Sequence, residues 1–531
     1  MADLSGFYSQ ITEIVRRAKD MKERLVEPFR TDNGGFLNPA IKAEREAASQ
    51  ILESSIKGSY YESIKQGAQV AAVNARALQN YEKTYGRLPN DDLLASCDKA
   101  IENGILVAEG KAQAGGIFEA AEMSTTDGIL MRNRLISLVL PVQLTSITSN
   151  FVTFIPGEFN QSEFYRIYRV AGSNFGDLTK GDRVDYDYDG VYSAMDQRKT
   201  LGTGDGSKVK FTFSSATDIG AVYPFKPKRT RVWVDHLQVA EDIGNGAIVG
   251  SYVVSGTTVT ITGTVTYATG IVEVNFSTAP AAGISIDLGF DVDIEKDPTL
   301  IPRVDHEMFS KVLYPHESAI SGNATIQALW ALRREIGQDI DNLIMQQMRN
   351  LLAADKDKKH LHDMLYHTKD SFQWSRKVPT GLTKQQHYES IVLPLLDIDT
   401  HLRQKNGISG LVGMVAGSQV VNLFRSMSAL HFQPAPGFKS SPQPHYVGRI
   451  FNQWDLFCDP NFDSLTAMCY AKGPDHGQTA YVVGDAVPAL TFRHPVLGDL
   501  VQKATMWDLS YRDMQPFDGE KYLCKFIVND L

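Results

Sequence analysis

The stretch from residue 199 to residue 294 restricts the possible folds of this chain more than any other part of the sequence. Apolar and β-branched residues alternate there with polar ones in short runs, at 209–213, 231–234, 251–254, 259–261, 265–267 and 271–276. Glycine-rich or polar turns separate most of the runs, which is typical of a small sandwich or barrel. Both ends of the stretch are also turn-like, so we expect an all-β module inserted into a host domain.

Residues 1–115 show a helical pattern instead. A narrow apolar seam with steps of three and four is formed by Phe7, Ile11, Ile14, Ala18, Met21 and Leu25. A second helical stretch starts after Asn38-Pro39 and breaks near Gly58, and a third starts near Asn90. An ordinary helical domain is one interpretation. The narrow seams and the lack of tryptophan favour the other, an extended arm or scaffold-like segment that packs on neighbouring subunits.

The remaining sequence mixes helices and strands. An apolar run ends at Pro141, and residues 152–156 and 164–170 are expected to form a pair of strands. Apolar residues three or four apart predict an amphipathic helix over Gln327–Met348. Leu411–Ala416 has the composition of a buried strand. Together these patterns predict an α+β fold.

Composition narrows the functional classes. A net charge of −9 over 531 residues argues against a dedicated nucleic-acid binder, which usually carries a basic face. The four cysteines are far apart and form no C-x-x-C pair, so we expect buried reduced thiols and no zinc site. The N-terminus lacks the pattern of a secretion signal, and no run approaches the roughly 20 apolar residues that span a bilayer. We therefore expect no membrane partner and assembly in a cytoplasm.

The sharpest local motif is an acidic loop with the spacing of a calcium site, formed by Asp185, Asp187, Asp189, Gly190 and Asp196. Asp196 stands where a bidentate glutamate is usual, and the flanks do not look helical. These departures favour an acidic loop that faces solvent or a basic neighbour, with a calcium site as the alternative.

A second candidate is the histidine cluster His360, His362 and His367. No cysteine or second cluster completes a metal site, so a solvated helix face is the favoured interpretation. The sequence contains no P-loop, no G-x-S-x-G and no H-E-x-x-H motif. We therefore predict no catalytic residues, no metal, no cofactor and no enzymatic activity.

The order of these parts resembles the major capsid proteins of tailed bacteriophages, which have the Hong Kong phage-type capsid fold, and in particular those of the large contractile-tailed group. The likeness covers roughly residues 115–531. It is carried by the apolar run ending at Pro141, the predicted strands up to Val170, the helix Gln327–Met348, the strand Leu411–Ala416, Gly448-Arg449-Ile450, Asp459-Pro460 and the strand ending at Lys472-Gly473.

The resemblance implies a peripheral domain with a long spine helix, an axial domain and an extended hairpin loop, together with an inserted small all-β domain and a helical N-terminal arm. Its expected parts are an arm (1–115), the start of the peripheral domain with the extended loop (116–198), the inserted β domain (199–294), the peripheral domain with the spine helix (295–385), the axial domain (386–490) and a return to the peripheral domain (491–531).

The same resemblance implies a capsid protein that assembles into hexamers and pentamers of an icosahedral phage head in the host cytoplasm. The implied partners are further copies of the chain, a portal, scaffolding, vertex or decoration proteins, and double-stranded DNA that is held without sequence specificity. In relatives such an N-terminal segment can be cut after glutamate, and Glu119 followed by Ala120 resembles such a site; we expect a retained arm. The alternatives are a tail sheath or tube subunit, and a metal-dependent enzyme built on the acidic loop or the histidines.

Overall fold

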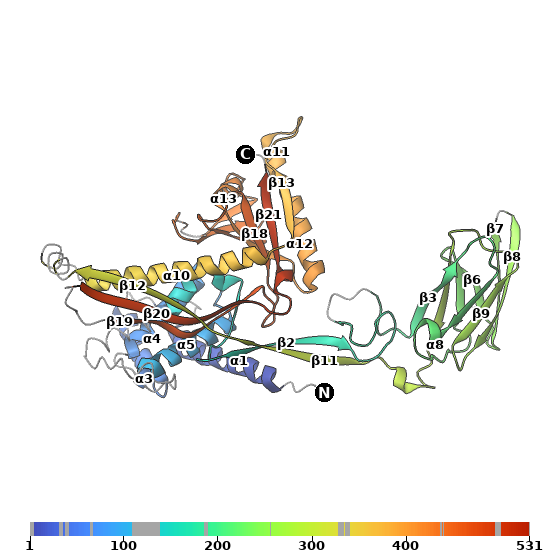
Figure 1. The fold of residues 1–531 in the computed structure, drawn as a ribbon, viewed down its shortest axis with the longest axis horizontal. Helices are drawn as coiled ribbons and strands as arrows, with labels where there is room; N and C mark the ends of the chain where they lie inside the picture. The colour runs from blue at the N-terminus through green and yellow to red at the C-terminus, as the bar shows by residue number, and fades with distance from the viewer. Residues whose placement is uncertain are drawn as a thin grey trace. The chain divides into compact units, whose positions relative to one another are not determined.

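The chain divides into two compact units in the computed structural model (Figure 1). The small unit comprises residues 167–307, and the large unit comprises residues 3–166 and 308–531. The structure describes residues 5–30, 36–37, 42–63, 67–108, 139–184, 190–254, 256–325, 327, 334, 340–435, 438, 440–493 and 501–529. Both helices and strands are abundant, which confirms the predicted α+β class.

The N-terminal part of the large unit is helical. Its helices are α1 (Ser5–Leu25), α2 (Lys42–Ser55), α3 (Tyr60–Ser63), α4 (Gly67–Tyr85), α5 (Asp91–Ala108) and α7 (Val139–Thr145). The helices predicted at the first seam and near Asn90 are present, as α1 and α5. Helix α5 carries two aspartates in its first turn, where their negative charge interacts favourably with the helix dipole and stabilises the helix. Helix α4 was not predicted as a separate helix, because its buried face includes Gly67, Asn74 and two alanines and so gives only a weak apolar pattern.

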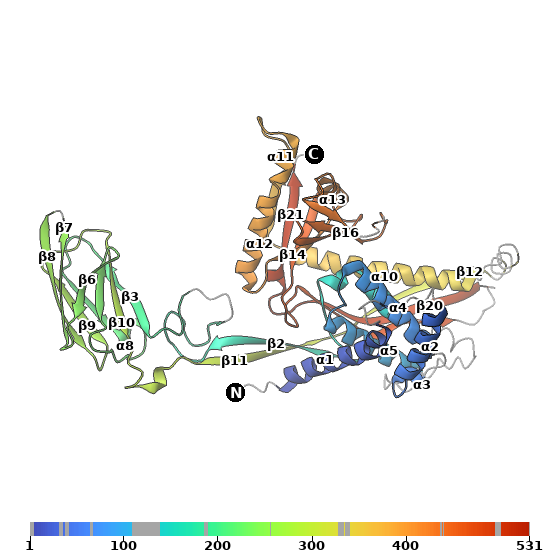
Figure 2. The same cartoon turned by 180° about the vertical axis from the view of Figure 1, so that it is seen from behind.

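These helices pack on their own chain. Helix α1 lies against α4 and α5, and its buried seam residues include Ile14, Ala18, Met21 and Leu25 (Figure 2). Most of them join one hydrophobic cluster with residues from the C-terminal half of the chain. The expectation of an extended arm is therefore corrected: the seam that suggested a neighbouring subunit is covered by helices of the same chain.

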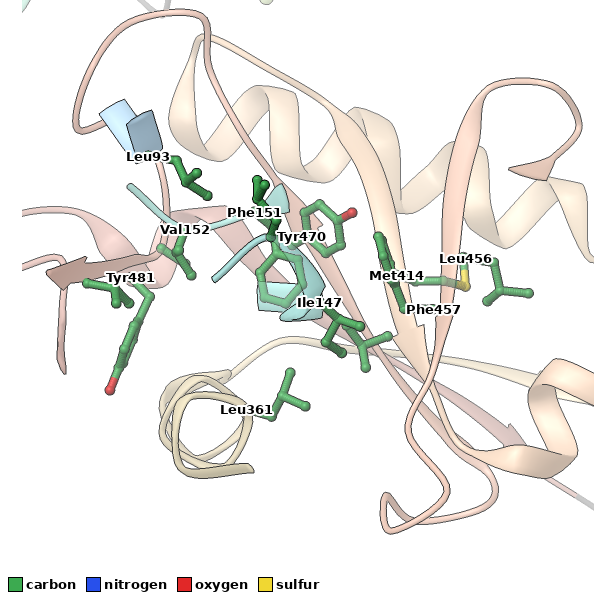
Figure 3. Packing of buried hydrophobic residues seen from close by; sticks show 14 of the residues in the cluster. Leu93, Ile147, Phe151, Val152, Leu361, Met414, Leu456, Phe457, Tyr470 and Tyr481 are labelled. Atoms are coloured by element: carbon green, nitrogen blue, oxygen red, sulfur yellow. The ribbon is translucent and has the colours of Figure 1, made fainter. Parts of the chain in front are cut away.

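That cluster is the core of the large unit. Leu93 of α5, Phe151 and Val152 after α7, and Leu361 from the long helix α10 (Ile340–His367) gather around Tyr470 and other strand residues (Figure 3). The rings of Phe151 and Tyr470 lie 4.5 Å apart between centroids. Four parts of the chain that are distant in sequence are thus held by one apolar core.

Helix α10 packs against a four-stranded sheet. The sheet has the order β1 (Thr153–Phe154), β19 (Tyr481–Arg493), β20 (Val501–Met514) and β12 (His316–Thr325), and α10 contacts the last three of these strands (Figure 1). The predicted helix Gln327–Met348 overlaps α10, but α10 continues to His367. The continuation was missed because polar residues occupy the inward positions between Leu352 and Leu361.

A seven-stranded sheet forms the other layer of the large unit. Its order is β13 (Ser371–Ser375), β21 (Leu523–Asn529), β18 (Thr466–Ala471), β14 (Leu411–Ala416), β17 (Trp454–Cys458), β16 (His445–Ile450) and β15 (Phe432–Pro434). The predicted strand at Leu411–Ala416 is central in this sheet. Helices α11 (Lys384–Glu389), α12 (Val392–Asn406) and α13 (Ser418–Arg425) accompany it. A capping box at Thr383 and Gln386 starts α11, and Gly407, with φ +70°, ends α12.

Pairing across the sheets corrects two sequence-based expectations. Strands β13 and β21 were expected in the peripheral domain, but they lie in the seven-stranded sheet together with β14 of the expected axial domain. Strand β19 begins within the expected axial domain (386–490), but it lies in the four-stranded sheet. The strands expected at 152–156 and 164–170 do not pair with each other. Strand β1 pairs in parallel with β19, and β2 (Ser162–Ala171) pairs with β11 (Val304–Leu313). Local alternation predicts strands but does not identify their partners.

The small unit is an eight-stranded antiparallel sheet. Its order is β3 (Asp196–Thr203), β10 (Ser285–Asp291), β5 (Arg231–Val234), β6 (Leu237–Asp242), β7 (Ala247–Val254), β8 (Thr257–Thr266), β9 (Ile271–Phe276) and β4 (Lys210–Ser214), with the short helix α8 (Ser215–Asp218) after β4. Its own apolar cluster includes the stacked rings of Phe225 and Phe290, with centroids 4.2 Å apart. In β4, β5 and β9 the alternation seen in the sequence places every second residue in that core.

Candidate functional site

Most of the acidic loop lies outside the described residues. This holds for Asp185, Asp187 and Asp189, whereas Asp196 is exposed at the start of β3. Glu119 and Ala120 also lie outside them. Within the part of the chain that the structure describes, no group of three or more His, Cys, Asp or Glu side chains could hold a metal ion. No described helix is both long enough and apolar enough to cross a bilayer.

The histidine cluster is divided by helix α10. His362 and His367 are exposed, but His360 is buried, so the interpretation as a solvated face is wrong for His360. Its Nδ1 lies 3.5 Å from the Thr148 hydroxyl, and its ring packs 5.2 Å from that of Tyr481. Burial, followed by the positive charge of Lys356, lowers the pKa of His360 to about 3. His360 is therefore a neutral side chain packed in the interior of the large unit.

One turn before His360, Lys356 lies between two carboxylates from the four-stranded sheet. Its Nζ is 3.0 Å from Oδ1 of Asp485 on β19 and pairs more closely with Oδ2 of Asp508 on β20. Asp508 is fully buried and Asp485 nearly so. Burial alone would lower the pKa of Lys356, but attraction to the two carboxylates outweighs burial and raises it above its usual value. The amine therefore stays protonated and is not available as a nucleophile or base.

A second set of contacts ties α7 and the turn after it to the same place. Gln143 donates from Nε2 to Oδ2 of Asp485 at 2.6 Å. Ser146 and Thr148 both donate to Oδ1 of Asp357. Burial raises the pKa of Asp357 to about 6, although the two hydroxyls oppose the shift. We call Lys356, Asp357, Asp485 and Asp508 the α10 charge cluster.

The cluster lies beside a cavity of about 390 Å³. Apolar residues of α7, α10 and β19 form part of its lining, and the polar part includes Gln143, Lys356, Asp357 and Asp485. The arrangement holds the Lys356 cation between the carboxylates of Asp485 and Asp508. These ion pairs act as a structural brace: they hold helix α10 on the four-stranded sheet.

Sequence reasoning missed this cluster, although one signal was available. Positions 352, 356, 360 and 364 lie four apart on α10, so Lys356 and His360 share a face with the buried Leu352 and Met364. Polar residues at those positions indicate an inward-facing polar group. Their partners could not be found in this way, because Asp485 is 129 positions away.

A buried ion network also fixes the N-terminal helices. Arg17 on α1 pairs with Asp98 and Glu102 of α5, at 2.8 Å each, and with Glu13 one turn earlier at 2.9 Å. Tyr60 donates its hydroxyl to Asp98 at 2.6 Å. The side chain of Asn103 donates to the carbonyl oxygens of Gly157 and Ala486 at 2.9 and 2.8 Å, so α5 is joined to the segment after β1 and to β19.

The surface of the large unit carries a second feature, on helix α12. Leu395, Ile398 and Leu402 of this helix are buried against the seven-stranded sheet. Leu393 and Leu396, on another face, are 61% and 44% exposed. A helix that is apolar on more than one side is usually covered on each of them. We call Leu393 and Leu396 the outer α12 leucines.

Comparison with solved structures finds capsids. The fold is similar to the icosahedrally averaged capsid of jumbo bacteriophage PhiKZ, with 9% identity and a TM-score of 0.34 over 70% of this chain and 90% of that one. It is also similar to the capsid of Myoviridae phage XM1, with 9% identity and a TM-score of 0.30 over 60% of this chain and 93% of the other. A virus-like particle from Pyrococcus furiosus matches with 11% identity and a TM-score of 0.27, over 42% and 80%. TM-scores of this size describe partial superposition only.

Two sequence matches complete the comparison. Residues 3–146 match a family model described as a domain of unknown function, DUF8615. The protein IncB of Escherichia coli is 32% identical over 185 residues, which are 33% of this chain and 86% of IncB. At this identity, over most of the length of that relative, the chain belongs to the family of Escherichia coli IncB.

Proposed function

We propose that this chain is a major capsid protein, which assembles with further copies of itself into hexamers and pentamers of an icosahedral phage head around double-stranded DNA. It acts in the virion, as a structural subunit and not as an enzyme. The portal and scaffolding, vertex or decoration proteins are the further partners that this role implies. Retention of the N-terminal segment belongs to the same proposal.

The observation that carries self-association is the second apolar face of α12. Leu393 and Leu396 expose apolar surface on a helix whose opposite side is already covered by the seven-stranded sheet. Burying a leucine side chain stabilises a contact by about 1.5–3 kcal/mol, so repeated copies of such a contact favour assembly. A neighbouring subunit is the cover that a shell would supply.

The architecture of the large unit supports the shell. The main parts follow one another in the order that the sequence resemblance implies. They are the strand pair β2–β11 beside the inserted β unit, the long helix α10 with the four-stranded sheet, and the seven-stranded sheet with its helices. Ion pairs and one apolar core make the large unit stiff. Stiff subunits with a defined contact surface can close a symmetric shell.

The test is assembly of the purified full chain, followed by size exclusion and negative-stain electron microscopy. We expect closed shells or hexagonal sheets from the unmodified chain. Leu393→Asp with Leu396→Asp places two charges in the proposed contact and is expected to abolish these products. Gln404→Asp, at an exposed position further along the same helix, is the matched control and should assemble normally.

Far-ultraviolet circular dichroism of each variant would show that the subunit remains folded. A folded double variant that still forms shells would show that the outer α12 leucines are not a subunit contact. An unmodified chain that stays monomeric at high concentration, also with phage scaffolding protein added, would refute the capsid proposal.

A further inference from the structure

The cavity beside the α10 charge cluster is large enough for a small ligand. Its volume of about 390 Å³ falls within the range of small-molecule sites, which is roughly 300–1,000 Å³. Small side chains leave the space open: Ala353 and Ala354 line it from α10, and Pro488 and Ala489 line it from β19. The brace formed by Lys356 does not account for this space.

Strand β19 is irregular where it lines the cavity. Its pairing with β20 shifts register between Val487 and Leu490. Pro488 and Ala489 therefore stand opposite Asp508 alone, as two residues against one in a β-bulge. Bulges bend a strand and are common beside binding sites, and proline is tolerated there because the ladder is already interrupted. The wall of the cavity is thus built into the strand.

One cation in the cavity lining has no counter-ion. Arg349 of α10 is partly buried, and within the described part of the chain its side chain donates only to Oδ1 of Asn350, at 3.3 Å. Its Nε is buried without a hydrogen-bond partner. Burial lowers the pKa of this guanidinium, as expected for a charge that no carboxylate compensates. The missing partner is an anion.

A second polar group in the lining also lacks a partner. Ser510 of β20 is 2% exposed, and its hydroxyl makes no hydrogen bond among the described residues. By contrast, the polar groups of Gln143, Lys356 and Asp485 in the same lining bind one another. Buried hydroxyls in folded proteins normally have a hydrogen-bond partner. The position of Ser510 in the cavity wall therefore indicates a partner inside the cavity.

The two unpaired groups lie at opposite ends of the cavity. Met506 of β20 packs with Leu352 of α10, and Asp508 binds Lys356 one helical turn later. Strand β20 and α10 therefore run in the same direction here, so Ser510 lies past Lys356. The unpaired arginine is seven residues before Lys356, which is about 10 Å along a helix. A ligand that reaches both groups has an elongated body.

We propose that this cavity binds a small amphipathic carboxylate, with the carboxylate at Arg349, an apolar body along α10 and a hydroxyl at Ser510. A carboxylate supplies the counter-ion that the guanidinium lacks, in the bidentate geometry that suits arginine. Leu352, Ala353 and Pro488 cover the apolar body. An ω-hydroxy acid of about eight carbons spans the ~10 Å between the two ends.

Other ligand classes fit these residues less well. A cationic ligand would be repelled by Arg349, and a purely apolar ligand would leave both Arg349 and Ser510 unpaired in a site without water. The cavity lies within one large unit, so the inference goes beyond the capsid proposal and does not depend on assembly.

Isothermal titration calorimetry of the purified full chain tests the site. The probes are 8-hydroxyoctanoate, octanoate, octan-1-ol and octylamine, each below its micelle concentration. We expect one 8-hydroxyoctanoate per chain, bound at least about tenfold more tightly than octan-1-ol, because only the acid pairs with the arginine. Octanoate should bind with intermediate affinity, and octylamine should not bind.

Four variants assign the contacts. Arg349→Gln should weaken binding of both acids about tenfold and leave octan-1-ol unchanged, whereas Arg349→Lys should keep part of the acid affinity. Ser510→Ala should reduce the affinity for 8-hydroxyoctanoate to that for octanoate. Ala489→Leu fills the cavity and should abolish binding of every probe. Lys358→Gln, on the same helix but outside the lining, is the matched control and should bind as the unmodified chain does.

Far-ultraviolet circular dichroism shows which variants are folded, and the comparison of the four probes on the unmodified chain needs no variant. Equal affinity for the acids and octan-1-ol, or no binding of any probe, would overturn the inference. Acid binding that survives Ala489→Leu in a folded chain would place the ligand elsewhere and would also overturn it.

A loss of acid binding on Arg349→Gln with retained binding of octan-1-ol would support the assignment, because the cavity is then intact and only the charge contact is gone.

Discussion

Replacing Lys356 by methionine should strongly destabilise the large unit. The substitution keeps most of the side-chain volume but leaves Asp485 and Asp508 without their shared cation. Both carboxylates are buried, and only Asp485 retains another donor from the contacts of this cluster, the Gln143 amide. Removing one partner of a buried ion pair typically costs about 3–5 kcal/mol. A unit charge about 4 Å from another is worth about 4 kcal/mol at an effective dielectric constant of 20, which agrees with that range.

The measurement is urea unfolding of the unassembled chain, followed by tryptophan fluorescence. With a denaturant dependence of about 3 kcal/mol per molar urea, we expect the midpoint to fall by about 1–1.7 M. Lys358→Met is the matched control on the same helix. Lys358 is 41% exposed and lies 3.9 Å from Asp355, so its loss should cost under about 1 kcal/mol.

A compensating variant separates charge from packing. Lys356→Met combined with Asp485→Asn and Asp508→Leu removes all three charges, and it should recover more than half of the lost stability because no carboxylate is left buried and unpaired. Equal costs for Lys356→Met and Lys358→Met would refute the role of the α10 charge cluster as a brace. A compensating variant no better than Lys356→Met would point to packing as the cause.

Three further predictions concern the large unit. Burial raises the pKa of Asp357 to about 6 in the folded chain, so ionising this carboxyl opposes folding increasingly from about pH 4 and fully above about pH 6. Asp357→Asn should therefore raise the free energy of unfolding by up to about 3 kcal/mol at pH 8, with the gain gone near pH 4, as urea titrations at the two pH values would show. Asn103→Leu leaves the Gly157 and Ala486 carbonyls unpaired, so it should cost about 2–4 kcal/mol and speed hydrogen exchange in α5; unchanged exchange would contradict this. The four cysteines are buried, and burial raises the pKa of Cys458 to about 11 and of Cys524 to about 12, so an aromatic disulfide reagent at pH 8 should label none of the four until urea is added.

Several features of the fold could be predicted from local sequence patterns. Steps of three and four identified α1 and α5, period-two alternation identified β4 and β9, and a continuous apolar run identified β14. The wide separation of the cysteines predicted free buried thiols, which the structure confirms. Each of these depends on residues within one element, where the spacing of apolar side chains decides which face is buried.

The partners of those elements were decided by the tertiary structure. The apolar seam of α1 indicated that the helix packs on something, but the sequence could not show that α4 and α5 of the same chain cover it. Likewise β1 is only two residues long, and its parallel partner β19 begins at Tyr481. Periodicity carries no information about sequence-distant neighbours, because many pairings bury the same face equally well.

The candidate site shows the same division. The spacing of four between Leu352, Lys356, His360 and Met364 can be read from the sequence, and it places all four on one face once this segment is helical. Only the tertiary structure decided that this face meets Asp485 and Asp508, and that Lys356 is therefore held as a charged brace while His360 stays neutral. The physical reason is that the charge state of a buried group depends on the groups that surround it in space, and the register of two distant strands supplies those groups.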